Sequence, residues 1–222
     1  MRASRAATGY ALWGSIRDAR SGATKTLHDS ITLASASPRR RQLLDQIGVR
    51  HQVCPADIDE SLRPGETPQG YVRRLAGEKA EAGWARDPSR PVLAADTAVA
   101  LGTELFGKPT DLTDGLRMLG ALSGRTHEVL TAVAVRSAVG LECAVSVSEV
   151  TFRELSVTER RRYWDTGEPL GKAGGYAIQG LAAAFIVALN GSYSGVVGLP
   201  LAQTAMLLGR AGVQIWNTKE SA

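Results

Sequence analysis

Residues 31–44 read Ile-Thr-Leu-Ala-Ser-Ala-Ser-Pro-Arg-Arg-Arg-Gln-Leu-Leu, a stretch that predicts a strand followed at once by a helix. The apolar residues at 31–35 predict a short β-strand. Ser37 and Pro38 predict the helix start, because serine is favoured at the N-cap and proline at the first helical position. Gly48 is expected to end this helix. A strand that turns directly into a helix is typical of folds that mix the two elements.

The same signals continue along the chain. Further helices are expected over 68–85, 113–122, between 156 and 167, and from 200 to about 212. Further strands are expected over 51–54, 91–101, 104–106, 126–136, 141–153 and 183–189, and a polar glycine loop over 190–198. Strands and helices alternate, but hairpins interrupt the alternation. The sequence therefore predicts an α/β fold with a mixed sheet.

The composition fits one globular domain with a proper core, since 44% of the 222 residues are hydrophobic and 22% are charged. The net charge is +4, of which residues 1–30 contribute +3. The near-neutral remainder argues against a nucleic-acid polymer as partner, because that needs basic residues spread over a face. The longest apolar run, residues 181–189, has nine residues, and a membrane span needs about 20.

Cysteine and histidine are scarce. Two cysteines and three histidines are too few for a disulfide framework, and their spacing does not resemble a zinc site. We therefore expect a reduced, cytoplasmic protein. Any catalytic divalent metal would be held by carboxylates, which suits Mg²⁺ or Mn²⁺. His127 lies in a strand pattern and is expected to be structural.

Residues 1–30 are expected to lie outside the folded domain, which would span 31–215 and leave 216–222 as a tail. The first 30 residues are rich in Ala, Ser, Thr, Gly and Arg and have no sustained apolar period. They lack the apolar core of a secretory signal. A disordered leader, a start codon assigned too far upstream and an organelle transit peptide all stay open.

Asp96 is the residue most indicative of chemistry, because it interrupts the apolar strand predicted over 91–101. A carboxylate in such a strand is costly unless it is paired, hydrogen-bonded or bound to a metal. The position predicts a general base or a metal ligand. The alternative is an aspartate at the end of a strand that merely faces water.

The helix start at 35–39 predicts a phosphate site. A helix N-terminus offers free N–H donors and the positive end of its dipole, and Ser35 and Ser37 add hydroxyl groups. Arg39 could make a two-point contact with a phosphate or a base edge. The alternative is an ordinary capped helix with solvated arginines.

Three further segments could contribute to a site. The acidic loop 57–60 could supply a second carboxylate to a Mg²⁺ ion, although such loops are often only solvated. Lys79 and Lys108 stand out because the chain has five lysines against 21 arginines. In the glycine-rich stretch 171–180, Gln179 carries an amide that both donates and accepts, which suits a nucleobase edge.

Together, these segments resemble the Maf family of nucleoside triphosphate pyrophosphatases. The matching stretches follow the family order over nearly all of 31–212: LASASPRRRQLL (33–44), DIDE (57–60), EKA (78–80), AADTAV (94–99), GKP (107–109), LSGRTHEVLTAVAV (122–135), GKAGGYAIQG (171–180) and GSYSGVVGLPL (191–201). The resemblance implies two lobes around a deep cleft, similar to inosine triphosphate pyrophosphatases. It also implies hydrolysis of a nucleoside triphosphate to the monophosphate and pyrophosphate, a divalent metal and a homodimer.

The resemblance also implies roles for individual residues. Asp96 matches the family's proton acceptor, and Glu60 matches an acidic residue of the metal site, which Asp96 could share. The remaining matches are Ser35, Lys79 and Lys108 at the phosphates, and Arg39, Thr97 and Gln179 at positions linked to substrate choice.

The stretch AGGYAIQG (173–180) is similar to that of the dTTP/UTP pyrophosphatases of the family. The sister group, which acts on 7-methyl-GTP, tends to have Ser-Glu-Gly where this chain has Ile-Gln-Gly at 178–180. A neutral amide at Gln179 can pair with the imide edge of uracil or thymine, whereas a carboxylate would favour guanine donors. A 7-methyl-GTP pyrophosphatase and a non-catalytic regulator of cell division remain the alternatives.

Overall fold

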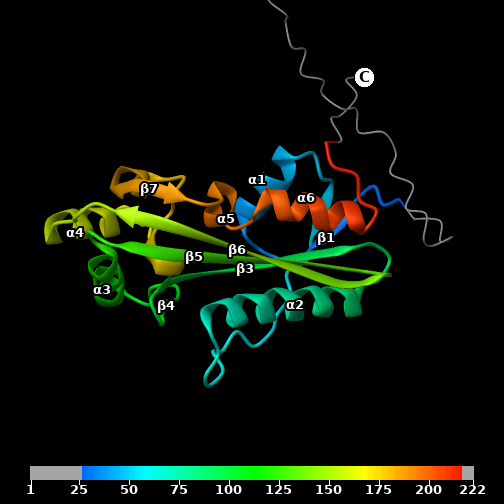
Figure 1. Ribbon diagram of the computed structural model, residues 1–222, viewed down its shortest axis with the longest axis horizontal. Helices are drawn as coiled ribbons and strands as arrows, with labels where there is room; N and C mark the ends of the chain where they lie inside the picture. The colour runs from blue at the N-terminus through cyan, green and yellow to red at the C-terminus, as the bar shows by residue number, and fades with distance from the viewer. Residues whose placement is uncertain (1–26, 217–222) are drawn as a thin grey trace, which may run out of the picture.

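The computed structural model describes residues 27–216 and forms a mixed seven-stranded sheet with helices on both faces (Figure 1). The strands are β1 (Ile31–Leu33), β2 (His51–Val53), β3 (Val92–Leu101), β4 (Glu104–Phe106), β5 (Thr126–Ser137), β6 (Gly140–Phe152) and β7 (Ile186–Asn190). The helices are α1 (Pro38–Gln46), α2 (Pro68–Arg86), α3 (Leu112–Leu122), α4 (Val157–Asp165), α5 (Tyr193–Val197) and α6 (Leu201–Arg210), with 3₁₀ turns η1 (Ala173–Gly175) and η2 (Leu181–Phe185).

The sheet order is β2-β1-β3-β5-β6-β7, with β4 paired to β3. Strands β2, β1 and β3 are parallel, and every other pair is antiparallel. The mixed α/β sheet expected from the sequence is therefore confirmed. Because β5 and β6 follow one another as a long hairpin, the antiparallel half needs no crossover helix.

One edge of β3 is left open in its middle. Strand β5 pairs with β3 over Val92–Ala100 on one edge. On the other edge, β1 pairs only with Val92 and Leu93, and β4 pairs only from Val99 onward. The chain leaves β1 after Leu33 and turns into α1, so residues 94–98 of β3 face a gap between β1 and β4. Successive side chains of a strand point to opposite faces of the sheet. At this gap, side chains on both faces of β3 can therefore border the same space.

Helix α2 covers one face of the sheet, and α1, α5 and α6 cover the other (Figure 1). The α2 face of the core is built from small side chains: Val72, Ala76 and Ala80 of the helix pack on Ala94, Ala98, Ala100, Ala132 and Ala134. Alanines let the helix lie close to the strands. On the opposite face, larger side chains pack: Leu33, Leu44, Leu93, Leu207 and Leu208. A third cluster, around Phe106, Leu119, Phe152 and Phe185, closes the end formed by α3 and α4.

The local signals at most helix starts are confirmed. Thr67 caps α2 by accepting a hydrogen bond from the Gly70 amide, and Ser156 and Glu159 form a capping box on α4. At α1, Pro38 occupies the first turn as expected, but the Ser37 side chain makes no capping hydrogen bond.

Two expectations near the C-terminus are wrong in part. The strand expected over 183–189 begins only at Ile186, because Leu181–Phe185 forms the 3₁₀ turn η2. The backbone amides of Leu181 and Ala182 donate to the Glu168 carboxylate and not to a neighbouring strand. The loop expected over 190–198 contains the short helix α5, which Ser192 caps through the Gly195 amide. The local polar partners, not the apolar run, decide both elements.

The expected leader and tail fall mostly beyond the described part of the chain. Residues 1–26 and 217–222 lie outside it, so the domain boundaries stay predictions. Within it, His28 forms a β-bridge with Val213. No helix in residues 27–216 combines the length and apolarity that crossing a membrane requires.

The close approach of α2 to the sheet depends on Gly83. A Cβ at Gly83 would lie 2.7 Å from Cγ1 of the fully buried Val92, whereas a Cβ at Gly77 of the same helix would lie 3.6 Å from its nearest neighbour. We expect Gly83→Ala to lower the free energy of unfolding by about 1–3 kcal/mol through overpacking. The matched change Gly77→Ala should raise it by up to about 1 kcal/mol, because alanine is the better helix former. Urea denaturation of the two variants measures both, and equal effects would contradict the packing described.

His127 makes the stability depend on pH. It is buried, and its Nε2 lies 2.8 Å from the Tyr176 hydroxyl. Burial lowers the pKa of His127 from 6.5 to about 4. Between these values the unfolded chain holds a proton that the folded chain does not, so stability falls as the pH drops from 6.5 to 4, by about 3 kcal/mol from this group.

Replacing His127 by Gln should flatten that slope. The carboxylates Glu66 and Glu159, whose pKa values are lowered to about 2, titrate in both proteins and cancel in the difference. Chemical denaturation of wild type and variant at several pH values gives the comparison. Parallel curves between pH 6.5 and 4 would contradict a neutral, buried His127.

Candidate active site

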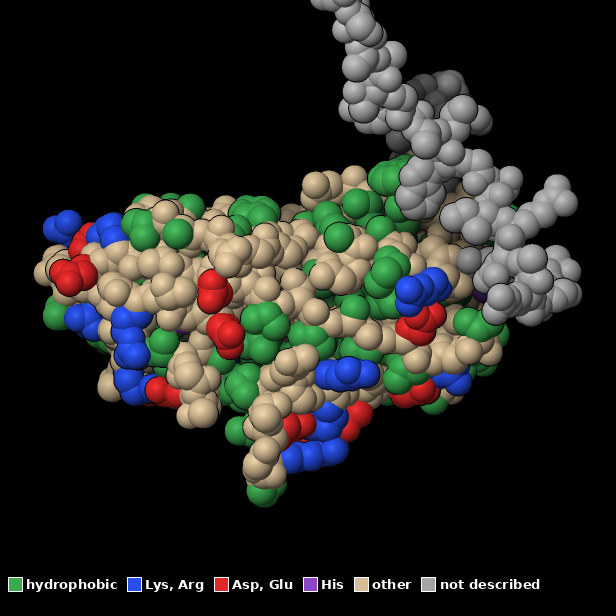
Figure 2. Space-filling model, in the orientation of Figure 1, with side chains coloured by type: hydrophobic (Ala, Val, Ile, Leu, Met, Phe, Trp, Pro, Cys, Tyr) green, Lys and Arg blue, Asp and Glu red, His purple; other side chains and the backbone are tan. Residues whose placement is uncertain are grey.

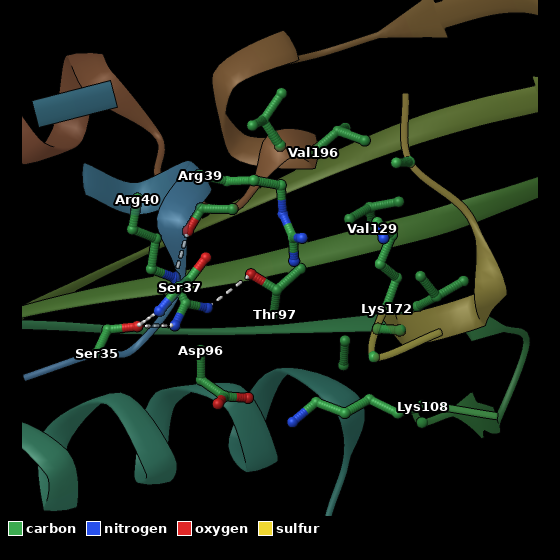
Figure 3. A pocket seen from close by; sticks show the side chains of 18 of the residues that line it. Ser35, Ser37, Arg39, Arg40, Asp96, Thr97, Lys108, Val129, Lys172 and Val196 are labelled. Atoms are coloured by element: carbon green, nitrogen blue, oxygen red, sulfur yellow. Dashed lines mark hydrogen bonds between the residues drawn. The ribbon is translucent and has the colours of Figure 1, made fainter. Parts of the chain in front are cut away.

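A cavity of about 690 Å³ lies at the open stretch of the β3 edge (Figure 3). It is lined by elements far apart in the sequence: the end of β1 and start of α1, the acidic loop, α2, β3, the segment after β4, and the stretch 171–179. All nine residues expected in the site line it: Ser35, Ser37, Arg39, Glu60, Lys79, Asp96, Thr97, Lys108 and Gln179. The structure thus brings the whole expected set together, while the role of each stays a prediction.

Lys79 joins two carboxylates in the wall of the cavity. Its Nζ lies 2.6 Å from Oδ1 of Asp96 and 2.7 Å from Oε1 of Glu60. Lys79 and Asp96 are buried, whereas half of the Glu60 side chain is exposed. The lysine offsets the cost of placing Asp96 in an apolar strand. The contacts of Lys79 are thus to carboxylates, and phosphate contact by it stays a prediction.

The charge around Glu60 favours its ionised form. Burial by itself raises the pKa of Glu60, but the hydrogen bond and charge of Lys79, with smaller effects from Lys108 and Arg40, outweigh it and lower the pKa. A second carboxylate next to Asp96 is therefore charged at neutral pH.

The loop that carries Glu60 is tied to α2. The Tyr71 hydroxyl donates to the Glu60 carbonyl at 3.0 Å, and Arg74 donates to the Ser61 carbonyl at 3.0 Å. Arg74 also pairs with Glu66, with two contacts of 2.6 and 2.7 Å. Because Lys79 lies on the same helix, α2 positions both ends of the Glu60–Lys79 contact.

Arg40 is the residue that the sequence analysis missed. It donates to Ser35 Oγ at 2.9 Å, to the Gly198 carbonyl at 2.9 Å and to Thr97 Oγ1 at 3.3 Å (Figure 3). None of these acceptors is charged, and no carboxylate among residues 27–216 lies within ion-pair distance of the guanidinium. Burial lowers the pKa of Arg40, and the more distant charge of Asp96 only partly opposes this. Since arginine stays protonated in proteins, Arg40 is a partly buried cation that has no carboxylate partner and could bind an anion.

A sequence signal for Arg40 existed. In the run Arg39–Arg41, Arg39 and Arg40 stand four residues before the buried Leu43 and Leu44 and share their face of α1. Arg41 stands four residues before the exposed Asp45 and is itself exposed. Helical spacing therefore separates the two inward arginines from the outward one.

Other cations surround the same space. Arg39, Lys108 and Lys172 reach into the cavity from three different segments (Figure 3). Burial lowers the pKa of Arg39, and burial and then the nearby charge of Arg39 lower that of Lys172. By contrast, basic and acidic groups lie next to each other on the outer face shown in Figure 2. Unbalanced positive charge thus gathers inside the cavity and would be relieved by a polyanion.

The cavity has a less polar end. Val129, Tyr176, Ile178 and Val196 line it, and Gln179 lies exposed beside them. An apolar wall with one amide next to it suits a flat heterocycle. The arrangement as a whole can take an anionic group at one end and a ring at the other.

A family model described as Maf-like protein matches residues 30–211. The chain belongs to the Maf-like protein family. This Maf-like chain is 57% identical to a dTTP/UTP pyrophosphatase of Anaeromyxobacter dehalogenans over 186 residues, which cover 82% of this chain and 94% of that protein. It is 52% identical to a dTTP/UTP pyrophosphatase of Cupriavidus pinatubonensis over 196 residues, covering 83% and 98%.

Two solved structures of Ham1 proteins are more distant from this Maf-like chain. The protein from Coxiella burnetii has a TM-score of 0.41 and 16% identity, covering 84% of this chain and 100% of that one. The protein from Staphylococcus aureus has a TM-score of 0.40 and 15% identity, covering 55% and 71%. Likeness at this level says nothing about activity.

The two neighbouring arginines of α1 should differ sharply in anion binding. We expect Arg40→Met to weaken binding of inorganic tripolyphosphate at least about tenfold, because a desolvated charge-assisted contact is lost. Arg41→Met should leave the affinity unchanged. Because Arg40→Met also removes three hydrogen bonds, the melting temperature of each variant is recorded so that loss of binding is distinguished from unfolding. Isothermal titration calorimetry with both variants decides this, and equal affinities would contradict an anion site at Arg40.

Proposed function

We propose that the protein is a nucleoside triphosphate pyrophosphatase that converts dTTP and UTP into the monophosphate and pyrophosphate. The observation that carries the proposal is a paired carboxylate centre, Asp96–Lys79–Glu60, in the same cavity as the unpaired cation Arg40. The names of relatives at 50–57% identity point to the same reaction.

The triphosphate would lie along the cationic part of the cavity. Arg40 supplies a fixed positive charge, because its other hydrogen bonds already hold the guanidinium in place. Arg39, Lys108 and the hydroxyls of Ser35 and Ser37 would contact the remaining phosphate oxygens. Prearranged donors of this kind stabilise the charge that builds on the leaving pyrophosphate.

Asp96 would accept the proton of the attacking water. Its Oδ1 bonds to Lys79, which holds the carboxylate in one orientation toward the cavity. The carboxylate is buried at the open edge of β3, where substrate and water can reach it from the cavity. A positioned carboxylate within reach of water is the requirement for general-base catalysis.

A divalent ion, Mg²⁺ or Mn²⁺, fits the donors present. No three His, Cys, Asp or Glu side chains within residues 27–216 are grouped so that they could hold a metal alone. The carboxylates of Glu60 and Asp96 both contact Lys79 Nζ, and Mg²⁺ is commonly bound by one or two carboxylates together with substrate phosphates. When bound, the ion neutralises phosphate charge and polarises the reacting phosphorus. Glu60 and Asp96 would hold it.

Gln179 would read the base. Its amide can donate to one and accept from another group of the uracil or thymine imide edge, next to the apolar wall at Tyr176 and Ile178. Arg39 would add contacts to the nucleotide, and Thr97 would act on substrate choice through the hydrogen bond that it accepts from Arg40.

A pyrophosphatase that removes unwanted pyrimidine nucleotides would serve as a house-cleaning enzyme in the cytoplasm, with both described cysteines free. The substrate is a single nucleotide, so the proposal needs no nucleic-acid polymer or membrane. A homodimer is part of the proposal, and sedimentation equilibrium tests it.

Asp96→Asn should lower pyrophosphate release from UTP about a thousandfold, within the range expected for loss of a general base. Glu60 keeps Lys79 paired, so the variant should remain folded. The matched control is Asp165→Asn on α4, which removes a surface charge away from the cavity and should keep full activity. The assay couples pyrophosphate release to a colour reaction, with dTTP, UTP, CTP, GTP and 7-methyl-GTP compared. Near-normal turnover by the Asp96 variant would contradict the role of Asp96 as the general base.

A further inference from the structure

The segment 176–182, which carries Gln179, is fixed at both ends by side chains that lie outside the proposed chemistry. On its N-terminal side, the hydroxyl of the buried Tyr176 lies 2.8 Å from Nε2 of His127. On its C-terminal side, the amides of Leu181 and Ala182 bond to Glu168. Gln179 thus lies between two anchored points.

Glu168 is the more elaborate of the two anchors. Its Oε2 accepts from the Leu181 amide at 2.9 Å, and its Oε1 accepts from the Ala182 amide at 3.1 Å and from the Tyr163 hydroxyl at 2.8 Å. Burial raises the pKa of Glu168, but the two amides and the hydroxyl outweigh it and lower the pKa. The ionised carboxylate therefore accepts the first two backbone amides of η2, the end of a helical turn where free amides favour an anion.

The backbone is shaped to receive this carboxylate. A Cβ on Gly180 would lie 2.2 Å from Oε2 of Glu168, so a side chain at that position and the carboxylate exclude each other. Lys172, which lines the cavity, donates to the Glu168 carbonyl at 2.5 Å. The Glu168 carboxylate thus lies against Gly180, which follows Gln179, and the Glu168 carbonyl bonds to Lys172 in the cavity wall.

We propose that Glu168 is a positioning residue for base selection, acting through Gln179. This rests on the proposed function, in which Gln179 contacts the base. An amide distinguishes hydrogen-bonding patterns only if its backbone is held in place, because a mobile side chain adapts to several ligands. Glu168 supplies that constraint from a position that does not itself contact substrate.

A double-mutant cycle tests whether Glu168 acts through Gln179. Glu168→Gln keeps the size of the side chain but places an NH₂ group against one of the two amides. We expect it to lower kcat/KM for UTP about tenfold, mainly through KM, and to reduce the preference for UTP over CTP. Gln179→Ala should have a similar effect. The double variant should be no worse than Gln179→Ala alone, because the two changes remove one coupled function.

The control is Glu159→Gln in the capping box of α4. This carboxylate also accepts a backbone amide, that of Ser156, but lies outside the cavity. It should cost stability without changing KM or the UTP preference. If Glu168→Gln does not fold, Tyr163→Phe replaces it, since it keeps the ring and removes the hydroxyl that bonds to Glu168. A loss of about threefold with the same coupling is then expected.

The outcomes separate the two proposals. Additive losses in the cycle would overturn the positioning role while leaving the pyrophosphatase intact. A Gln179→Ala enzyme with unchanged kcat/KM and base preference would overturn both the base contact and the role of Glu168. Absence of pyrophosphate release from the wild type would instead contradict the proposed function itself.

Discussion

The contact of Lys79 with Asp96 and Glu60 is the interaction on which the rest of the site depends. A carboxylate in the middle of an apolar strand and a lysine on a buried helix face would each be costly alone, and they are tolerated because they meet. Their meeting requires α2 to lie close to β3. The alanine-lined face of the sheet and Gly83 allow that approach. The helix packing and the centre are therefore one structural requirement.

The second constraint is the interrupted edge of β3. In a fully paired sheet, Asp96 and Thr97 would point to opposite faces and never share a ligand. Here β1 stops at Leu33 and β4 starts opposite Val99, so both side chains reach one cavity. Asp96 meets the lysine of α2, and Thr97 meets Arg40 of α1. The Asp96–Lys79–Glu60 contact and Arg40 thus lie on either side of the same strand and line the same cavity.

Residues that are energetically costly where they stand, or that mark the start of a helix, could be found from the sequence. Asp96 was conspicuous in its strand, and Pro38, Thr67 and Ser156 marked helix starts correctly. Glu60 was weak by itself, because acidic loops are common, and only its contact with Lys79 distinguishes it. The Asp96–Lys79 contact spans 17 residues of sequence, and no local pattern encodes such a pair.

Other features could not be predicted because their hydrogen-bond partners are distant in the sequence. Arg40 carried a readable helical spacing, but its acceptors at Thr97 and Gly198 come from elsewhere in the chain. The turn η2 replaced the first part of an expected strand because Glu168, 13 and 14 residues earlier, takes its amides. The apolar run 181–189 did not indicate burial either, since only Ala182 and Phe185 of it are buried. Polar partners decide which backbone shape the run adopts.

The most direct test of the central claim is the product ratio from UTP in the presence of Mg²⁺, followed by ³¹P NMR. A centre that hydrolyses between the α and β phosphates yields UMP and pyrophosphate in equal amounts, with no accumulation of UDP. Release of orthophosphate with UDP, or an unchanged UTP spectrum under the same conditions, would contradict it.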